Sequence, residues 1–390
     1  LRERVSETLG RLYAVHWPFH YPKTARGMRL SPFHDRLAAR GACFSEAQGW
    51  ERPGWFAPDG VVAEYVYSFK RQNWFEHSAA EHRAVREGAG LFDQTSFAKF
   101  ELRGGDAEGV LSQVCANNVA VEPGRVVYTQ WLNERGGIEA DLTVTRLTAD
   151  RYRIISGVAS QVRDFHWLKR HIPGGADAAL TDVTEDLAVL GVMGPKSRDL
   201  LQKVTGADLS NDTFPYRTSA EIDIAGVRLR ASRITYVGEL GWELYMPHGG
   251  AHAVFDAIVG AGADRGLVSA GVHAMNSLRI EKAYRHWGHD IGDQDTPLEA
   301  ALGFAVAWDK SGGFIGRDAV LKQRDNGIRR RLVQFLLEDP EPLLYGNEPI
   351  RRDGAIAGSL TTAMYGHTLG GAVGLGYVEN TDGGIVTADF

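Results

Sequence analysis

The stretch VVYTQWLNERGGIEADLTVTRL, residues 126–147, decides the fold of this chain. Its two ends, 126–132 and 138–147, are rich in β-branched and apolar residues, which favour strands. The turn NERGG between them is short and contains glycine, as the turns of β-hairpins do. We therefore predict two antiparallel strands joined by this turn.

The segments on either side of the hairpin predict an α+β fold. Before it, apolar and small residues at helical spacing stop at Gly88 and Gly90, and glycine commonly ends a helix. The expected order is strand, helix, hairpin, strand and helix, over 97–104, 106–117, 126–147, 151–157 and 159–172. This order favours an antiparallel sheet with helices on one face. No GxGxxG follows a strand at either end, so we expect no dinucleotide-binding domain in the chain.

The second half of the sequence repeats this alternation and then becomes rich in strands. Helices are expected at 195–206, 252–262 and 271–288, with strands before and between them. After about residue 326, short strands separated by glycine turns predict a small barrel or sandwich. The first residue is Leu1 and the last is Phe390, and we expect both ends to continue into a longer polypeptide.

Composition excludes several classes of protein. The 390 residues carry 43 basic and 49 acidic side chains, a net charge of −6, so nucleic acid and anionic membranes are not expected partners. No apolar run approaches the roughly 18 residues of a membrane span. The two cysteines, Cys43 and Cys115, make neither a CxxC nor a zinc spacing. A reducing compartment is expected.

Asp141 and Tyr128 are the first candidate site residues. They lie on the two strands of the hairpin and can be neighbours across it. Asp141 stands between Ala140 and Leu142 in an otherwise apolar strand. An unpaired buried carboxylate is costly, so this one is expected to have a partner or a catalytic task. The alternative is an aspartate on an edge strand in contact with water.

The segment YVGELGWELY, residues 236–245, places a second carboxylate among aromatic residues. Gly238 and Gly241, on either side of Glu239, predict a turn or bulge before Glu243. A rigid carboxylate there can accept two parallel N–H bonds from an amidine-like ring edge, while the aromatic rings stack on the heterocycle. The alternative is a β-turn with solvated glutamates.

One basic residue, the histidines and the N-terminal segment are the remaining features with a possible role in a site. Arg279, on the helix expected over 271–288, could meet an anionic substrate tail, and the alternative is a helix with ordinary surface ion pairs. The 13 histidines show no HExxH or other metal spacing, and no GxSxG occurs, so neither a metal site nor a serine hydrolase is expected. The aromatic segment 1–60 is either a packed linker or part of an active-site wall.

Together these segments resemble the aminomethyltransferase (T-protein) family of glycine cleavage, and still more closely the C-terminal halves of dimethylglycine and sarcosine dehydrogenases or oxidases. The matching strings run in family order: VREGAGLFDQTSFAKFELRG, LNERGGIEADLTVTRL, LGVMGPKSRDLLQKVT, RITYVGELGWELYMP, AMNSLRIEKAYRHWGHDI, TPLEAALGFAVAWDK and FIGRDAV. The opening HWPFHYPKTARGMRLSPFHDRLAARGACF is similar to the stretch that links the flavin half to the folate half in those two-part enzymes.

Two departures narrow the resemblance. The T-protein helix has an arginine where this chain has Met275, which is the dehydrogenase-like version and leaves Arg279 as the match. The iron–sulfur assembly paralogues carry a cysteine in a KGC-type motif, whereas KSGGFIGRDA at 310–319 has none. This favours one-carbon chemistry over an assembly role.

The resemblance implies a role for each candidate residue. Asp141 matches the acidic residue near N10 of the folate, and Tyr128 matches the tyrosine that lines that site. Glu243 matches the glutamate that holds the amino-pyrimidine edge of the pterin, with Tyr236 beside it. Arg279 matches the helix arginine near the folate.

The implied fold has three lobes around a central folate, plus a small C-terminal β-barrel that is expected to be incomplete. Residues 1–60 would be a linker or arm from a preceding flavin half. The expected domains are folate-binding domain 1 (61–97 and 182–285), an α+β domain 2 (98–181), a connecting segment (286–326) and the C-terminal barrel (327–390).

The implied activity is tetrahydrofolate-dependent capture of the methyl-derived carbon of an N-methyl amine, of the dimethylglycine or sarcosine type, as 5,10-methylenetetrahydrofolate. FAD is expected in a flavin half, on the same polypeptide or a partner subunit, but not in this chain. The expected compartment is the cytoplasm, or the mitochondrial matrix in a eukaryote. The alternatives are a folate-dependent demethylase of a sulfonium or aryl methyl ether, a glycine-cleavage-type aminomethyltransferase, and a folate-binding scaffold without turnover.

Overall fold

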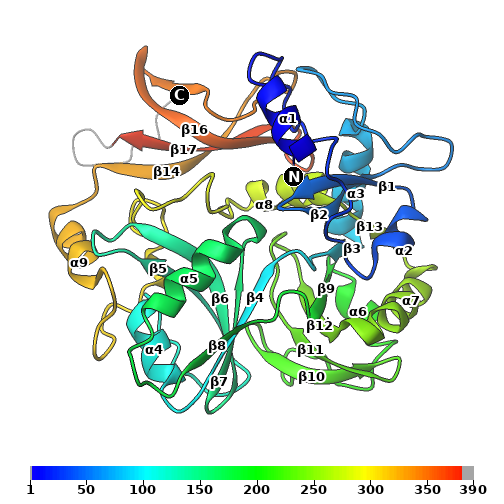
Figure 1. Cartoon of the computed structure of the whole chain (residues 1–390). Helices are drawn as coiled ribbons and strands as arrows, with labels where there is room; N and C mark the ends of the chain where they lie inside the picture. The colour runs from blue at the N-terminus through cyan, green and yellow to red at the C-terminus, as the bar shows by residue number, and fades with distance from the viewer. Residues whose placement is uncertain (1, 380–390) are drawn as a thin grey trace. The chain divides into compact units, whose positions relative to one another are not determined.

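The structure is a computed structural model that describes residues 2–379 (Figure 1). These residues form two compact units, which we name unit 1 and unit 2. Unit 1 consists of the residues up to Ser96, Glu185–Lys282 and His367–Leu369. Unit 2 consists of Phe97–Thr184, Ala283–Gly366 and the residues from Gly370.

Unit 1 is built on a six-stranded sheet with the strand order β10-β11-β12-β9-β3-β13. Neighbouring strands are antiparallel except β13 and β3, which run parallel. The strands are β3 (Ala89–Asp93), β9 (Leu187–Met193), β10 (Ser219–Ile224), β11 (Val227–Ser232), β12 (Gly241–Pro247) and β13 (Leu267–Ser269).

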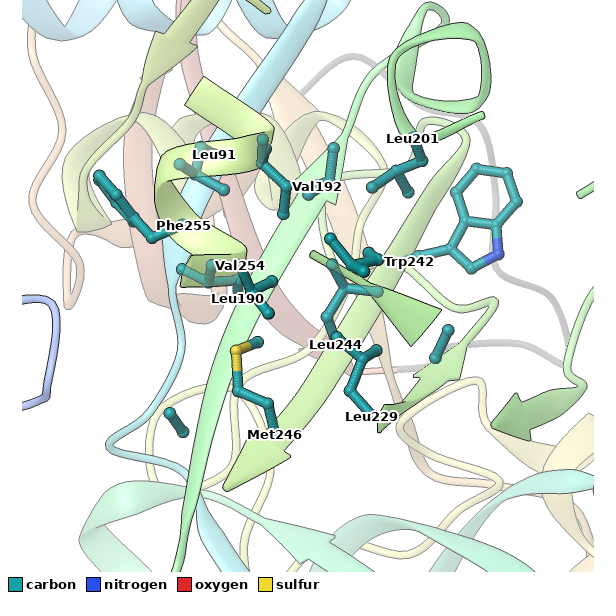
Figure 2. Close-up of a cluster of buried hydrophobic side chains, with 14 of the residues drawn as sticks. Leu91, Leu190, Val192, Leu201, Leu229, Trp242, Leu244, Met246, Val254 and Phe255 are labelled. Carbon is teal, nitrogen blue, oxygen red and sulfur yellow. The ribbon is translucent and has the colours of Figure 1, made fainter. Parts of the chain in front are cut away.

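One face of this sheet carries an apolar core (Figure 2). Side chains alternate between the two faces along a strand, so Trp242, Leu244 and Met246 of β12 all belong to this core. Helices α6 (Ser197–Leu201) and α7 (Ala251–Gly262) supply the covering side chains. Each buried large apolar side chain contributes roughly 1.5–3 kcal/mol, so this packing fixes β12 firmly. The residues between them, including Glu243, therefore point to the opposite face.

The opposite face packs against α3 (Phe75–Glu87) and α8 (Val272–Glu281). Val85 of α3, Leu278 of α8, Phe92 of β3 and Met193 of β9 are members of one buried cluster. Helices α3 and α8 also contact each other. This face is therefore lined by helices from two distant parts of the sequence.

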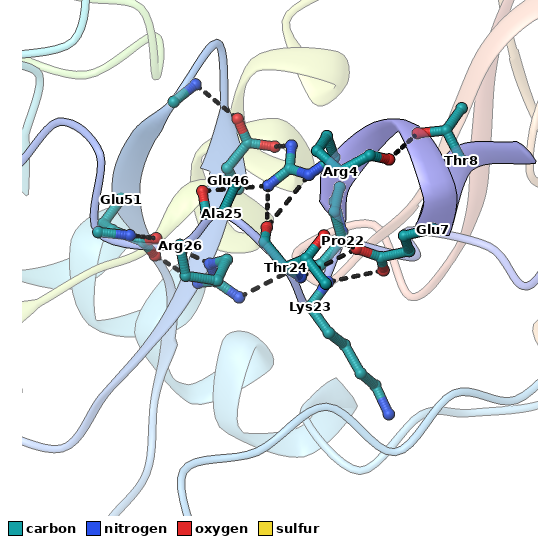
Figure 3. Close-up of polar contacts among 12 residues, drawn as sticks. Arg4, Glu7, Thr8, Pro22, Lys23, Thr24, Ala25, Arg26, Glu46 and Glu51 are labelled. Atoms are coloured by element: carbon teal, nitrogen blue, oxygen red, sulfur yellow. Dashed lines mark hydrogen bonds and ion pairs between the residues drawn. The ribbon is translucent and has the colours of Figure 1, made fainter. Parts of the chain in front are cut away.

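The N-terminal segment is packed within unit 1 by charged hydrogen bonds (Figure 3). Arg4 donates to the Thr24 carbonyl at 3.1 Å and to Glu46 Oε2 at 3.0 Å. Glu7 accepts from the backbone N–H groups of Lys23 at 2.8 Å and Thr24 at 2.9 Å. The elements here are α1 (Arg2–Gly10), α2 (His34–Ala38), β1 (Ala42–Ala47) and β2 (Trp50–Phe56).

Unit 2 contains a five-stranded antiparallel sheet with the order β5-β6-β7-β4-β8. Helices α4 (Ala107–Val114) and α5 (Gln161–Arg170) contribute Leu111 and Trp167 to its core. The side chain of Asn133 accepts two backbone N–H bonds and shapes the hairpin turn. The strands are β4 (Ala98–Arg103), β5 (Val126–Leu132), β6 (Ile138–Thr148), β7 (Arg151–Ser156) and β8 (Ala179–Asp182).

A second, four-stranded antiparallel sheet in unit 2 follows helix α9 (Arg317–Asn326), with the order β14-β17-β16-β15. Its strands are β14 (Arg330–Leu336), β15 (Pro349–Arg352), β16 (Ala355–Gly366) and β17 (Gly371–Glu379). The expectation that the C-terminal barrel is incomplete concerns residues 380–390, which lie outside the described residues.

The α+β class and the hairpin at 126–147 are confirmed. The helix predicted over 271–288 is too long, because α8 ends at Glu281. Ala283 has φ of 53°, and a helix cannot continue through this left-handed conformation. The domain boundaries expected from the sequence stay predictions. Within residues 2–379, every helix is too short or too polar to cross a membrane.

Candidate functional site

Glu243 is a buried carboxylate on the helix-covered face of the unit 1 sheet. Only 8% of its surface is exposed, while its neighbours Trp242 and Leu244 point into the opposite core. Tyr245, two residues along the same strand, donates its hydroxyl to Glu243 Oε2. Burial raises the pKa of Glu243, and the hydrogen-bonding groups of Tyr245 and Gln94 oppose this rise. A carboxylate held in this way is a rigid acceptor.

Gly191 makes room beside Glu243. It is the cross-strand partner of Glu243 on β12 and of Phe92 on β3, so the three positions share one face. The side chain of Gln94 occupies the space that a residue larger than glycine would fill, since a Cβ on Gly191 would lie 2.5 Å from Gln94 Oε1. Gln94 therefore lies next to the Glu243 carboxylate, and the sequence analysis missed it.

The loop before β12 carries Tyr236 and is held by Arg86 of α3. Arg86 Nη1 donates to the Val237 carbonyl at 2.6 Å and to Glu239 Oε1 at 2.9 Å. Its Nη2 donates to the Leu278 carbonyl at 2.8 Å. Tyr236 packs against the same buried cluster as Phe92 and Met193. Arg86 thus fixes the aromatic loop to α3 and α8, a role that no local sequence pattern indicated.

Glu281, at the end of α8, is the second carboxylate partner of Arg86, at 3.1 Å. It also accepts the backbone N–H of Thr368 at 2.8 Å and lies 3.4 Å from His82 Nε2. Burial favours a higher pKa for Glu281, but hydrogen bonds and charges from His82, Thr368 and Arg86 outweigh it and hold the pKa at about 2. Arg279 lies on the same helix and is only 2% exposed. Its contact with a substrate tail stays a prediction.

Asp141 lies in unit 2, on β6. Its cross-strand partner is Gln130, whose Nε2 donates to Asp141 Oδ1 at 2.8 Å. Tyr128 lies two residues earlier on β5, on the same face, and hydrogen-bonds with Asp141. Burial raises the pKa of Asp141 to about 6, although Gln130, Tyr128 and the positive charge of Arg285 oppose the rise. A carboxyl group with this pKa can hold or release a proton near neutral pH.

The structure therefore brings the candidate residues together as two groups, one in each unit. Tyr128 contacts Asp141, as the hairpin predicted. Tyr236 and Glu243 belong to unit 1 and Asp141 to unit 2, so their cooperation on one ligand stays a prediction. Among residues 2–379, no group of three or more histidine, cysteine or acidic side chains is arranged to hold a metal ion.

Two surface cavities lie in unit 2. One, of about 400 Å³, is lined by Glu139, Arg163 and Trp287, among others. The other, of about 1120 Å³, is lined by the hairpin turn and by residues 312–319. Glu139, two residues before Asp141, lines both cavities, but Asp141 and Tyr128 line neither.

The sequence and the fold match those of one family. Residues 33–310 match the model described as the GCVT N-terminal domain, and residues 330–387 match the glycine cleavage T-protein C-terminal barrel domain. The chain therefore belongs to the glycine cleavage T-protein family. The predicted resemblance and the predicted T-protein-like fold are confirmed.

Three known proteins show where the chain lies within this family. It is 45% identical to 4-methylaminobutanoate oxidase (formaldehyde-forming) of Paenarthrobacter nicotinovorans, over 97% of this chain and 46% of that protein. It is 38% identical to human mitochondrial sarcosine dehydrogenase, over 100% of this chain and 46% of that protein. The crystal structure of the aminomethyltransferase T of the glycine cleavage system from Bartonella henselae matches with a TM-score of 0.77 and 25% identity, over 90% of each chain. These relatives are enzymes, and the chain spans about half the length of the first two.

Proposed function

We propose that this chain binds tetrahydrofolate and transfers to it the methyl-derived carbon of an N-methyl amine, as the folate half of a flavin-dependent demethylating enzyme. The observation that carries the proposal is the buried Glu243 carboxylate, fixed by Tyr245 on a rigid strand. A pterin presents two adjacent N–H donors on its pyrimidine edge, and a carboxylate can accept both.

The residues present fit this ligand. Glu243 is 8% exposed, and a buried carboxylate is stable only when polar groups compensate for its lost hydration. The hydroxyl of Tyr245 donates one hydrogen bond to Oε2, which uses one of the two lone pairs of that oxygen. Oε1 and the second lone pair of Oε2 thus retain capacity to accept N–H groups from a ligand. Tyr236, held nearby by the Arg86 contacts of its loop, offers an aromatic face for stacking on a flat ring.

In the mechanism, the chain positions the ligand and moves a proton. When bound, tetrahydrofolate supplies the two amine nitrogens that take up one carbon from an iminium or from formaldehyde, with release of the demethylated amine or of water. Glu243 orients the ring, which provides proximity. Asp141, with its pKa of about 6, accepts a proton at N10 and returns it to the departing group. Gln130 and Tyr128 hold the Asp141 carboxylate for this task.

The partner would be a flavin-binding half that oxidises the amine. In support, exposed large apolar side chains concentrate in the N-terminal segment of unit 1, where Tyr13 is 99% and Met28 is 65% exposed. Exposed apolar groups gathered on one segment are typical of a surface that another domain covers. The family relatives named above are about twice as long as this chain, which leaves room for such a half.

The experiment is a calorimetric titration of the purified chain with folinic acid. The proposal expects saturable binding that Glu243→Ala abolishes. Glu221→Gln is the matched control, because Glu221 is a strand glutamate of the same sheet whose side chain is 46% exposed and forms ion pairs with Arg228 and Arg230. Such pairs contribute little to stability, so this variant should bind normally. Equal binding by the Glu243 variant and the wild type would refute the site.

A second measurement tests the reaction. The flavin half is supplied with sarcosine, dimethylglycine or 4-methylaminobutanoate, and the folate product is identified. Methylenetetrahydrofolate would support the proposal. Methyltetrahydrofolate formed from a sulfonium or aryl methyl ether would instead indicate a demethylase of another kind, because the oxidation state of the carbon differs. Folate binding without formation of any folate product would indicate a folate-binding protein that does not catalyse the transfer.

A further inference from the structure

Gln94 is a buried amide at the candidate pterin site. It follows β3, and its backbone N–H is anchored on the Val189 carbonyl at 3.0 Å. Its side chain is 2% exposed and lies over Gly191, the cross-strand partner of Glu243. The amide and the carboxylate are therefore side by side on one face of the sheet.

Neither polar atom of this amide has a hydrogen-bond partner. Within residues 2–379, both Gln94 Oε1 and Nε2 are buried and unpaired. The amide is near enough to the Glu243 carboxylate to lower its pKa, but the geometry falls short of a formed hydrogen bond. Buried polar groups in folded proteins are almost always paired, so an orphaned amide indicates a missing partner such as a ligand.

The geometry points to Gln94 as the residue that recognises the C4 oxygen of a 2-amino-4-oxopteridine, beside Glu243. This inference rests on the proposed folate binding at Glu243. The ring edge of such a pteridine presents the 2-amino group, N3–H and O4, which are two donors and one acceptor. Glu243 supplies two acceptors and Gln94 Nε2 supplies the donor that completes the match.

The same arrangement selects against 4-amino pteridines. In a 4-amino pteridine, N3 carries no hydrogen, and an amino group replaces the oxygen at C4. A donor of the ligand then faces the donor of Gln94, and N3 faces the carboxylate without a hydrogen between them. A site built to hydrogen-bond one ligand edge rejects an analogue that leaves its buried groups unpaired.

The test compares folic acid with aminopterin, which differ at the C4 substituent. Wild type should bind folic acid more tightly than aminopterin. Gln94→Met has a similar size and no amide, and should reduce that preference by about tenfold, the value of one hydrogen bond. It should unfold at a temperature no lower than wild type, because it removes an orphaned buried amide.

Gly191→Ala is the second variant and keeps Gln94 intact. Its Cβ would lie 2.5 Å from Gln94 Oε1, so it displaces the amide and should reduce the same preference. An unchanged ratio of the two dissociation constants in a folded variant overturns the inference. Failure of the wild type to bind folic acid, or full binding after Glu243→Ala, overturns the proposed function instead. The two failures are therefore distinguishable.

Discussion

Asp141→Asn is the change that most directly tests the raised pKa in unit 2. The folded protein holds the Asp141 proton with a pKa of about 6, against an ordinary value of 3.8. The difference corresponds to about 3 kcal/mol between the two protonation states. Because the folded pKa is the higher one, the folded state binds more protons than the unfolded state between about pH 4 and 6. Stability contributed by this group is present at low pH and is lost as the pH rises through 6.

Asparagine cannot ionise, so the variant escapes that loss. We expect the free energy of unfolding of Asp141→Asn, relative to wild type, to increase by about 3 kcal/mol from pH 3.5 to pH 7. Urea unfolding at a series of pH values measures this difference, and carboxyl NMR of ¹³C-labelled aspartate gives the pKa directly. At the same time, formation of the folate product should fall about 10²–10⁴-fold, the usual contribution of a general acid–base.

Two results would refute this reasoning. The first is a stability difference between variant and wild type that stays constant over this pH range. The second is an Asp141 carboxyl signal that titrates at 4 or below. Normal product formation by a folded Asp141→Asn protein would not contradict the raised pKa of Asp141. It would show that another group transfers the proton.

The remaining predictions concern other buried charges and the hairpin. Glu101→Gln should cost about 3 kcal/mol at pH 7. Arginines at 103, 151 and 153 outweigh the effect of burial and hold the pKa of Glu101 at about 2, and the cost should vanish as the pH falls from 4.5 to 2 in urea titrations. Arg86→Met should weaken folinic acid binding more than tenfold and lower stability by about 3–5 kcal/mol, because the buried Glu281 and the partly exposed Glu239 lose their cation. Unchanged affinity in calorimetry would show that the loop held by Arg86 does not contact the ligand. Gly137→Ala should lower the melting temperature, since its Cβ would lie 1.9 Å from the Asp293 carbonyl, whereas Gly109→Ala, with open space around it, should not.

The parts of the fold that sequence predicted well depend on neighbours in the chain. The hairpin at 126–147 follows from strand-forming residues on both sides of a glycine turn, and it brings Tyr128 to Asp141 without help from distant residues. Gln130, the direct partner of Asp141, was missed although it alternates with Tyr128 on the same strand. That alternation is the signal that could have revealed it.

The parts that sequence did not predict depend on contacts between distant segments. Gln94 reaches Glu243 only because Gly191, on a strand between them, has no side chain. Arg86 bonds to Val237 and Leu278, which are 151 and 192 residues away. Local spacing carries no information about such pairs. The overlong helix at 271–288 has a different cause, because the left-handed turn at Ala283 is not marked by a glycine.

The contact of Glu281 with Thr368 has a consequence for biosynthesis. Unit 1 is assembled from three separate stretches, and the last of them, His367–Leu369, is synthesised after most of unit 2. Until the ribosome has released those residues, the Glu281 carboxylate lacks the backbone N–H groups of Thr368 and Leu369. His82 likewise lacks the Thr368 hydroxyl, which lies 2.7 Å from its Nε2 in the finished protein. These contacts of unit 1 therefore form only after most of unit 2 has been synthesised, and removing the C-terminal sheet together with residues 367–369 would leave Glu281 and His82 without them.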